Sequence, residues 1–127
     1  MENSLNIPQT IDSNEYLYRG VVQIQCDDEN NRPTSAAFKC SNGVSVNRDV
    51  NILDLDECVH TLLSSHSFKA ICRIKQQSIN DIEAVTKYLP VPGNDYHCEI
   101  HDSETKIRLS DSKCKKLRTQ AEVVYTE

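Results

Sequence analysis

The chain has 127 residues, a formal net charge of −5 at pH 7 and 38% hydrophobic residues. This length is typical of one domain that buries a core of its own. The sequence has no apolar run of the roughly eighteen residues that cross a membrane, and its first residues lack the basic and apolar regions of a secretory signal. We therefore expect a cytoplasmic protein without a membrane partner.

The start of the chain is polar and then turns regular. Residues 1–15 mix polar side chains with isolated Ile and Leu, so they are predicted to form a flexible N-terminal arm, followed by one domain over residues 16–127. Val22, Ile24 and Cys26 alternate with glutamines, which is the pattern of a half-buried strand. A strand is therefore expected from residue 16 to residue 26.

Two further strands are expected before residue 50. One covers Ala36–Lys39 and the other begins at Val44. Asn42-Gly43 lies between them and is typical of a type I′ turn, in which both central residues have positive φ. The segment therefore predicts a meander with polar residues on one side.

The clearest helix runs from Asp54 to Ser65. Its apolar residues recur at the helical spacing and form one face. Asp54 and Glu57 form a capping-box pair that accepts the free N–H groups of the first turn. Residues 68–75 then alternate as a strand, with Phe68 pointing inward.

The second half of the chain continues in mixed order. Ser78–Tyr88 is predicted to be a short helix and residues 96–101 a strand. A last helix is expected to begin after Ser110, with Cys114 and Leu117 pointing inward. Strands and helices in this order, without a βαβ repeat, favour an α+β fold: a single small domain with a mostly antiparallel sheet and two or three helices.

The six cysteines are separated by 14 to 26 residues and include no CxxC pair. These spacings differ from those of zinc sites, so we expect unpaired, mostly buried thiols, no metal site and no cofactor. Cys98 follows His97 directly, but neighbours on a strand point to opposite faces and cannot act together as nucleophile and base.

The charge is unevenly distributed. Between Glu104 and Arg118, six basic residues accompany two acidic ones, a local charge of +4 that leaves −9 on the rest of the chain. This acidic balance argues against a general nucleic-acid binder. The last helix either presents an ordinary solvated face or docks an acidic partner or a phosphate with its outward basic residues, Lys113, Lys115, Lys116 and Arg118.

Three short motifs are Arg32-Pro33-x-Ser35-x-Ala37-Phe38, Gly43-x-Ser45-Val46-x-Arg48 and Asn94-x-x-His97-x-x-Ile100. Together they resemble a group of small bacterial proteins of unassigned function, in which a Tyr-Arg pair precedes an RPSSxAF-like segment and a histidine follows a loop containing Pro and Asn. The resemblance spans residues 16 to about 120. It departs at Thr34, where the group has Ser, and at Cys98, where the group has a small residue. It implies a bacterial protein but no particular activity.

The candidate ligand-binding residues are Arg19, Arg32, Ser35, Lys39, Ser45, Arg48 and His97. Arginine binds phosphate or carboxylate oxygens through two parallel hydrogen bonds, and hydroxyls and turn N–H groups satisfy the remaining acceptors. Histidine side chains in general titrate near neutral pH, so His97 is the candidate catalytic acid or base. The alternative is structural, with arginines in surface ion pairs and hydroxyls in turns.

We expect a small accessory or binding module that recognises an anionic ligand, such as a phosphate-bearing small molecule, or a protein partner. It would act as an adaptor, antitoxin or immunity-like subunit beside a larger bacterial protein. The alternative is a small enzyme acting on a nucleotide or another phosphorylated substrate, with Arg19, Arg32 and Arg48 as a clamp and His97 as acid/base. The enzyme requires these four side chains to converge in one pocket, whereas the binding module does not.

An ADP-ribosyltransferase-like enzyme is a more specific form of the alternative. Tyr18-Arg19-Gly20 resembles the arginine on the first core strand of that superfamily, and Thr34-Ser35 resembles its Ser-Thr-Ser strand. No Glu-x-Glu or Gln-x-Glu motif follows, so Glu99 would have to serve alone.

Overall fold

The computed structural model describes residues 7–127, so the prediction for the first six residues of the arm lies outside the described part of the chain. The larger sheet contains β1 (Tyr16–Val21), β4 (Val44–Arg48), β5 (Ala70–Lys75), β6 (Val85–Tyr88), β7 (His97–His101) and β8 (Glu122–Thr126). The other elements are the hairpin of β2 (Cys26–Asp27) and β3 (Arg32–Pro33), the 3-10 turns η1 (Gln23–Gln25) and η2 (Ser35–Phe38), and the helices α1 (Leu55–Ser65), α2 (Gln76–Asp81) and α3 (Asp111–Gln120).

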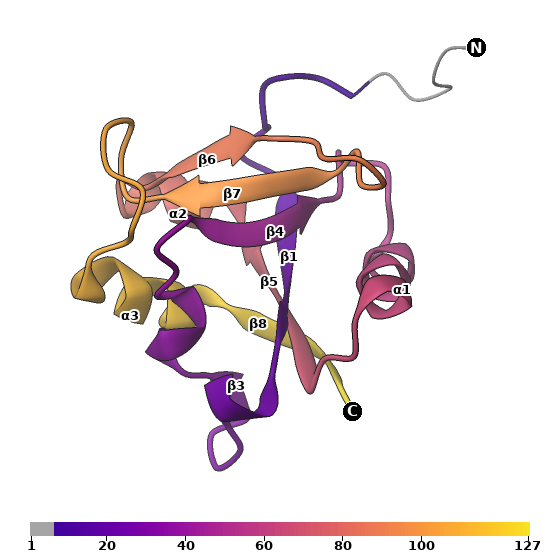
Figure 1. Ribbon diagram of the computed structural model, residues 1–127, viewed down its shortest axis with the longest axis vertical. Coiled ribbons are helices and arrows are strands. Elements are labelled where there is room, and N and C mark those ends of the chain that lie inside the picture. Colours follow the sequence, from indigo (N-terminus) through magenta and orange to yellow (C-terminus); the bar gives the residue numbers. More distant parts are fainter. Residues whose placement is uncertain (1–6) are drawn as a thin grey trace.

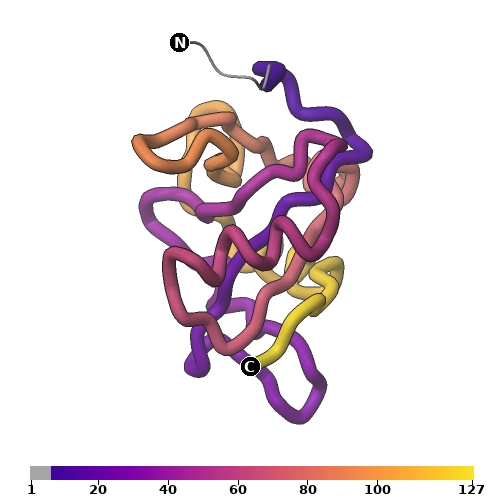
Figure 2. Tube along the Cα trace, turned by 90° about the vertical axis from the view of Figure 1, so that its right-hand side faces the viewer, coloured from indigo at the N-terminus to yellow at the C-terminus, as the bar shows by residue number. Residues whose placement is uncertain are grey.

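The six-stranded sheet is antiparallel throughout, in the order β6-β7-β4-β1-β5-β8 (Figure 1). Helix α1 covers one face, where it faces the viewer in Figure 2. The other face is covered by η2, α2 and α3 and carries the larger apolar core. The predicted α+β class with a mostly antiparallel sheet is confirmed.

Strand β1 joins the two halves of the sheet. Leu17 lies opposite Arg48 of β4 and Ile74 of β5. Because side chains alternate along a strand, Leu17, Arg19 and Val21 point to the face of α3, whereas Tyr18 points to the face of α1. This alternation decides which predicted site residues can meet.

The segment before β1 is attached to the domain. The backbone oxygens of Pro8 and Thr10 accept hydrogen bonds from Arg48, Ile11 packs against the larger core, and Glu15 is buried. Parts of residues 8–15 are therefore in contact with the domain, and the division into an N-terminal arm and one domain stays a prediction.

Helix α1 begins as predicted. Asp54 is the N-cap and accepts the Glu57 N–H, while the Glu57 carboxylate accepts the Asp54 N–H. This reciprocal pair satisfies two N–H groups that the helix itself cannot. Cys58 and its apolar neighbours then pack on Tyr18 and Ile71 of the sheet.

The predicted strand from residue 16 to residue 26 is wrong beyond Val21. The chain turns into η1, where the Gln25 side chain accepts the Val22 N–H, and Ile24 is 86% exposed. The predicted strand over residues 36–39 is also wrong, because η2 occupies this segment and inserts Ala37 and Phe38 into the core.

Other boundaries differ as well. Of Asn42-Gly43, only the glycine has a positive φ, so the turn is not type I′. The predicted helix over residues 78–88 ends at Asp81, because Glu83 adopts a left-handed φ of 62° and the following residues form β6. The sequence did not predict β8.

Within residues 7–127, no helix combines the length and the apolar character that crossing a membrane requires.

Candidate functional site

The seven predicted ligand-binding residues do not come together. They lie on both faces of the sheet and in the connection between β1 and β4, and most of them are engaged by the protein itself.

Arg48 is fully buried and satisfied internally. Its guanidinium contacts the Glu15 carboxylate at 2.8 Å, donates to the backbone oxygens of Pro8 and Thr10 at 2.6 and 3.2 Å, and lies over the Tyr88 ring at 4.8 Å. A ligand cannot reach this side chain without opening the core. The predicted role of Arg48 in anion binding is therefore not supported.

Arg19 links two segments of the chain. Its Nε donates to the Ala37 oxygen at 2.9 Å, one terminal nitrogen donates to the Ser45 backbone oxygen at 2.8 Å, and the other lies 3.4 Å from the Cys40 sulfur. The side chain therefore holds η2 against β4, which is a structural task.

Arg32, Ser35 and Lys39 lie at the hairpin and η2. Arg32 pairs with Asp27 at 3.7 Å, and Lys39 pairs with Asp111 at 3.7 Å. Arg32 also borders a cavity of about 20 Å³, which is roughly the space of one water molecule. The cavity that Arg32 borders is therefore too small for a nucleotide.

His97 and Ser45 lie on the face of the sheet opposite to Arg19. His97 is next to Cys98, whose side chain is in the larger core, so its ring points to the other face, where its Nδ1 lies 2.8 Å from the Leu89 oxygen. The arginine clamp and the acid/base of the enzyme hypothesis are thus separated by the sheet. Convergence, which that hypothesis requires, does not occur.

The same face of the sheet carries a pair of side chains, Glu99 and His101, that the sequence did not predict. Glu99 Oε1 lies 3.0 Å from His101 Nε2, and both groups pack on Gly43, where an added Cβ would lie 2.8 Å from the same carboxylate oxygen. Glu99, which the ADP-ribosyltransferase-like reading would need as its catalytic carboxylate, is therefore paired with a histidine of its own strand. The φ of 97° at Gly43 and this pair together favour glycine at position 43.

All six cysteines are free, and four of them are buried. Burial raises the pKa of the Cys58, Cys72 and Cys98 thiols to about 12. Since the thiolate is the reactive form, these three side chains are inert as nucleophiles near neutral pH. In residues 7–127, no three His, Cys, Asp or Glu side chains are placed to hold a metal ion.

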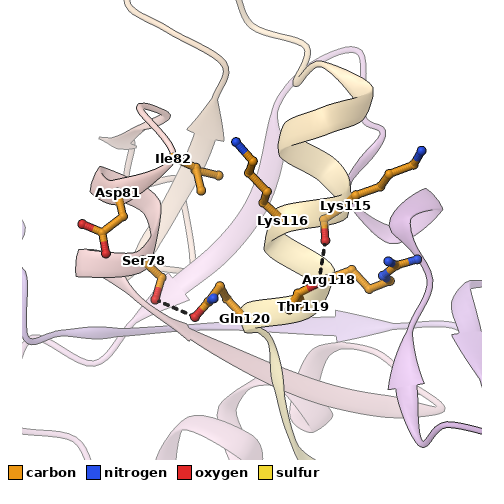
Figure 3. Close-up of a pocket in the computed structure, with 8 residues that line it drawn as sticks. All are labelled: Ser78, Asp81, Ile82, Lys115, Lys116, Arg118, Thr119 and Gln120. Atoms are coloured by element: carbon orange, nitrogen blue, oxygen red, sulfur yellow. Dashed lines mark hydrogen bonds between the residues drawn. The ribbon is translucent and has the colours of Figure 1, made fainter.

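The clearest concave surface is a groove of about 430 Å³ between α2 and α3 (Figure 3). Its α2 wall carries Ser78, Asp81 and Ile82, and its α3 wall carries Lys115, Lys116, Arg118, Thr119 and Gln120. Ser78 donates a hydrogen bond of 3.3 Å to the Gln120 side chain and connects the two walls. We call this surface the α2–α3 groove.

Helix α3 carries three cations at the groove, but they do not all point toward α2. Cys114 and Leu117 fix the rotation of α3 by inserting into the core, as predicted, so the intervening positions face outward. In Figure 3, Lys116 points toward Ile82, whereas Lys115 and Arg118 point to the other flank of α3. The cations therefore lie along both flanks of one helix.

These cations are not neutralised within residues 7–127. Lys115, Lys116 and Arg118 have no ion pair there, and the buried Nε of Arg118 has no hydrogen-bond partner. The nearest acidic residues along the chain have other partners: Asp111 pairs with Lys39, and Glu122 pairs with Arg73. The three cations of α3 therefore have no ion-pair partner among the described residues, although Asp81 lies on the opposite wall of the groove.

The sequence identified the basic face of α3 but not the groove, because α2 is its second wall and the packing of α2 on α3 has no local signal. No family model, curated protein or solved structure matches this chain. The resemblance to the bacterial group therefore stays a prediction.

Proposed function

We propose that this protein is a small binding module that recognises an anionic partner through the α2–α3 groove. The observation that carries the proposal is a set of three cations, Lys115, Lys116 and Arg118, that have no ion pair within residues 7–127 and lie along the groove. An anionic partner would supply the counter-charges that the described part of the chain does not.

The charge distribution supports this proposal. The protein has a net charge of −5, so three neighbouring basic residues without ion pairs stand out against an acidic background. Acidic residues elsewhere on the surface repel an anion, which favours its approach to basic residues such as those of α3. The same background disfavours a long nucleic acid, whose phosphates extend beyond a small basic region.

The internal contacts of the predicted site residues also favour a binding function over a catalytic one. Arg19 and Arg48 hold backbone segments together, and His97 lies across the sheet from Arg19. The α2–α3 groove itself contains no histidine or cysteine. General acid–base or thiol chemistry would therefore have few candidate groups there.

The proposal is tested by charge reversal. The Lys115→Glu/Lys116→Glu double variant is compared with Lys69→Glu/Lys75→Glu, which changes the net charge equally at positions outside the groove. The probes are a labelled polyglutamate peptide, labelled oligothymidylate and inorganic tripolyphosphate, and binding is measured by fluorescence anisotropy or calorimetry.

We expect at least one probe to bind the wild type, and the groove variant to weaken this binding by more than tenfold while the control changes it only slightly. Equal losses in both variants would show non-specific attraction and overturn the proposal. So would the failure of all three probes to bind the wild type.

A further inference from the structure

We infer that the occupant of the α2–α3 groove is an extended acidic segment of another protein, which crosses the last two turns of α3 and places an apolar side chain on Ile82. This inference rests on the proposed function and names the class of its partner. It follows from the divergence of the cations and from the other groups in the groove.

The divergence of the cations disfavours a single phosphate. Lys116 lies on the α2 side of α3, whereas Lys115 and Arg118 lie on the opposite flank (Figure 3). The oxygens of one phosphate group are too close together to contact both flanks. A chain with several carboxylates can cross the helix and contact each flank with a different side chain.

The location of the three cations near the C-terminal end of α3 also disfavours a compact anion. Residues 115–120 form the C-terminal half of the helix, where the backbone carbonyls carry partial negative charge. A compact anion therefore gains nothing from the helix backbone at this end. Binding depends on the long lysine and arginine side chains, which reach carboxylates lying away from the helix axis.

The α2 wall favours a ligand that has donors and apolar groups as well as negative charge. Asp81 is exposed and accepts from Gln77 at 2.8 Å, so its carboxylate retains further acceptor capacity. A polyphosphate has no donors to offer it, but the backbone N–H groups of an extended polypeptide do. Half-buried Ile82 offers apolar surface beside these polar groups.

The groove also lacks what single-stranded nucleic acids use. No aromatic side chain lines it, so bases have no stacking platform. Among polyanions, an acidic polypeptide therefore fits the lining best.

The experiment compares four labelled probes on the full chain. The first is a peptide of about ten residues in which glutamates alternate with glycines around a central leucine. The second replaces the leucine with glycine, the third replaces the glutamates with glutamines, and the fourth is an oligothymidylate of similar length. Each is titrated by anisotropy at about 50 and 150 mM salt, because contacts between exposed charges weaken as salt screens them.

We expect the leucine-containing acidic peptide to bind best and the glutamine peptide to lose binding. Replacing leucine with glycine should weaken binding by up to about tenfold, the effect of removing roughly 50 Å² of apolar contact. This difference should shrink in Ile82→Ala, whose folding is checked by circular dichroism. If Ile82→Ala does not fold, the comparison of the two acidic peptides on the wild-type protein still tests the apolar contact.

The outcomes separate the two proposals. If oligothymidylate or tripolyphosphate binds through Lys115 and Lys116 and neither acidic peptide does, the partner class is overturned while the anion-binding function stands. If both acidic peptides bind equally well, the apolar contact with Ile82 is overturned. If no anionic probe binds, both proposals fail.

Discussion

The guanidinium of Arg48 donates to both carboxylate oxygens of Glu15, at 3.0 and 2.8 Å, and neither side chain is more than 2% exposed. This pair joins the segment before β1 to the end of β4. Glu15 also accepts the Val50 N–H, so it holds the turn that follows β4 as well. Arg48 therefore contributes to stability where the sequence suggested ligand binding.

Replacing Arg48 should destabilise the fold strongly. Arg48→Met leaves Glu15 buried without its counter-charge, and we expect the free energy of unfolding to fall by about 3–5 kcal/mol. The Glu15→Gln/Arg48→Met double variant should recover part of this loss because no unpaired charge remains. Urea unfolding measures both.

Arg32→Met is the matched control for that experiment. Arg32 is also an arginine of the predicted site, but its contact with Asp27 is 3.7 Å long and partly exposed, so little change is expected. Equal destabilisation by the two single variants would contradict the assignment of Arg48 as the buried anchor.

Gly20→Ala should lower the melting temperature because the Phe68 ring occupies the space of the missing side chain. An added Cβ would lie 2.4 Å from ring atoms of Phe68, closer than any ordinary contact. Thermal unfolding followed by circular dichroism measures the loss, and Gly20→Ala/Phe68→Leu should recover part of it. Gly93→Ala, which meets no atom within 4 Å but has a φ of 85°, should lose only about 1 kcal/mol. A larger loss at Gly93 than at Gly20 would reject the steric explanation.

The thiols should react in the order of their burial. Because burial raises the pKa of Cys58, Cys72 and Cys98 to about 12, little thiolate forms at pH 8, and the core also blocks access. Iodoacetamide should therefore modify the half-buried Cys26 and Cys40 first, and all six cysteines once urea unfolds the chain. Mass spectrometry of the labelled peptides gives the order. Early labelling of Cys98 in the folded protein would contradict its placement in the core.

Asp102 should stabilise the fold only when it is ionised. The Ser110 N–H, with a smaller contribution from Lys113, lowers the pKa of this carboxyl below its ordinary value. Its stabilisation is therefore complete above the unfolded pKa near 3.9 and disappears as the pH falls through the lower folded value. Asp102→Asn should be less stable than the wild type at pH 7, and the two should converge below about pH 4. A difference that does not depend on pH would show that Asp102 acts through packing.

Local signals explain what the sequence predicted correctly. Helix α1 is encoded by its capping box at Asp54 and Glu57 and by an apolar face that its own residues define. The rotation of α3 follows in the same way from Cys114 and Leu117. Both features depend on residues within one helix, so one sequence is enough to find them.

Tertiary packing explains what the sequence missed. The alternation from Val22 to Cys26 fits a strand equally well, but Ile24 finds no core to enter and the chain turns instead. Phe38 is buried from a 3-10 turn, because Arg19 holds the backbone of η2 from a distant strand. Arg48 and Glu15 are 33 positions apart, so no local sequence pattern indicates that they pair.

Helix α2 continues directly from β5, and α3 leads directly into β8, its neighbour at the edge of the sheet. The two walls of the groove thus continue two paired strands, β5 and β8. A partner that bridges the walls is therefore expected to hold the edge strand β8 more firmly against β5. Amide hydrogen exchange along β8 should then slow when the groove is occupied. This measurement would detect a bound partner without a label in the groove.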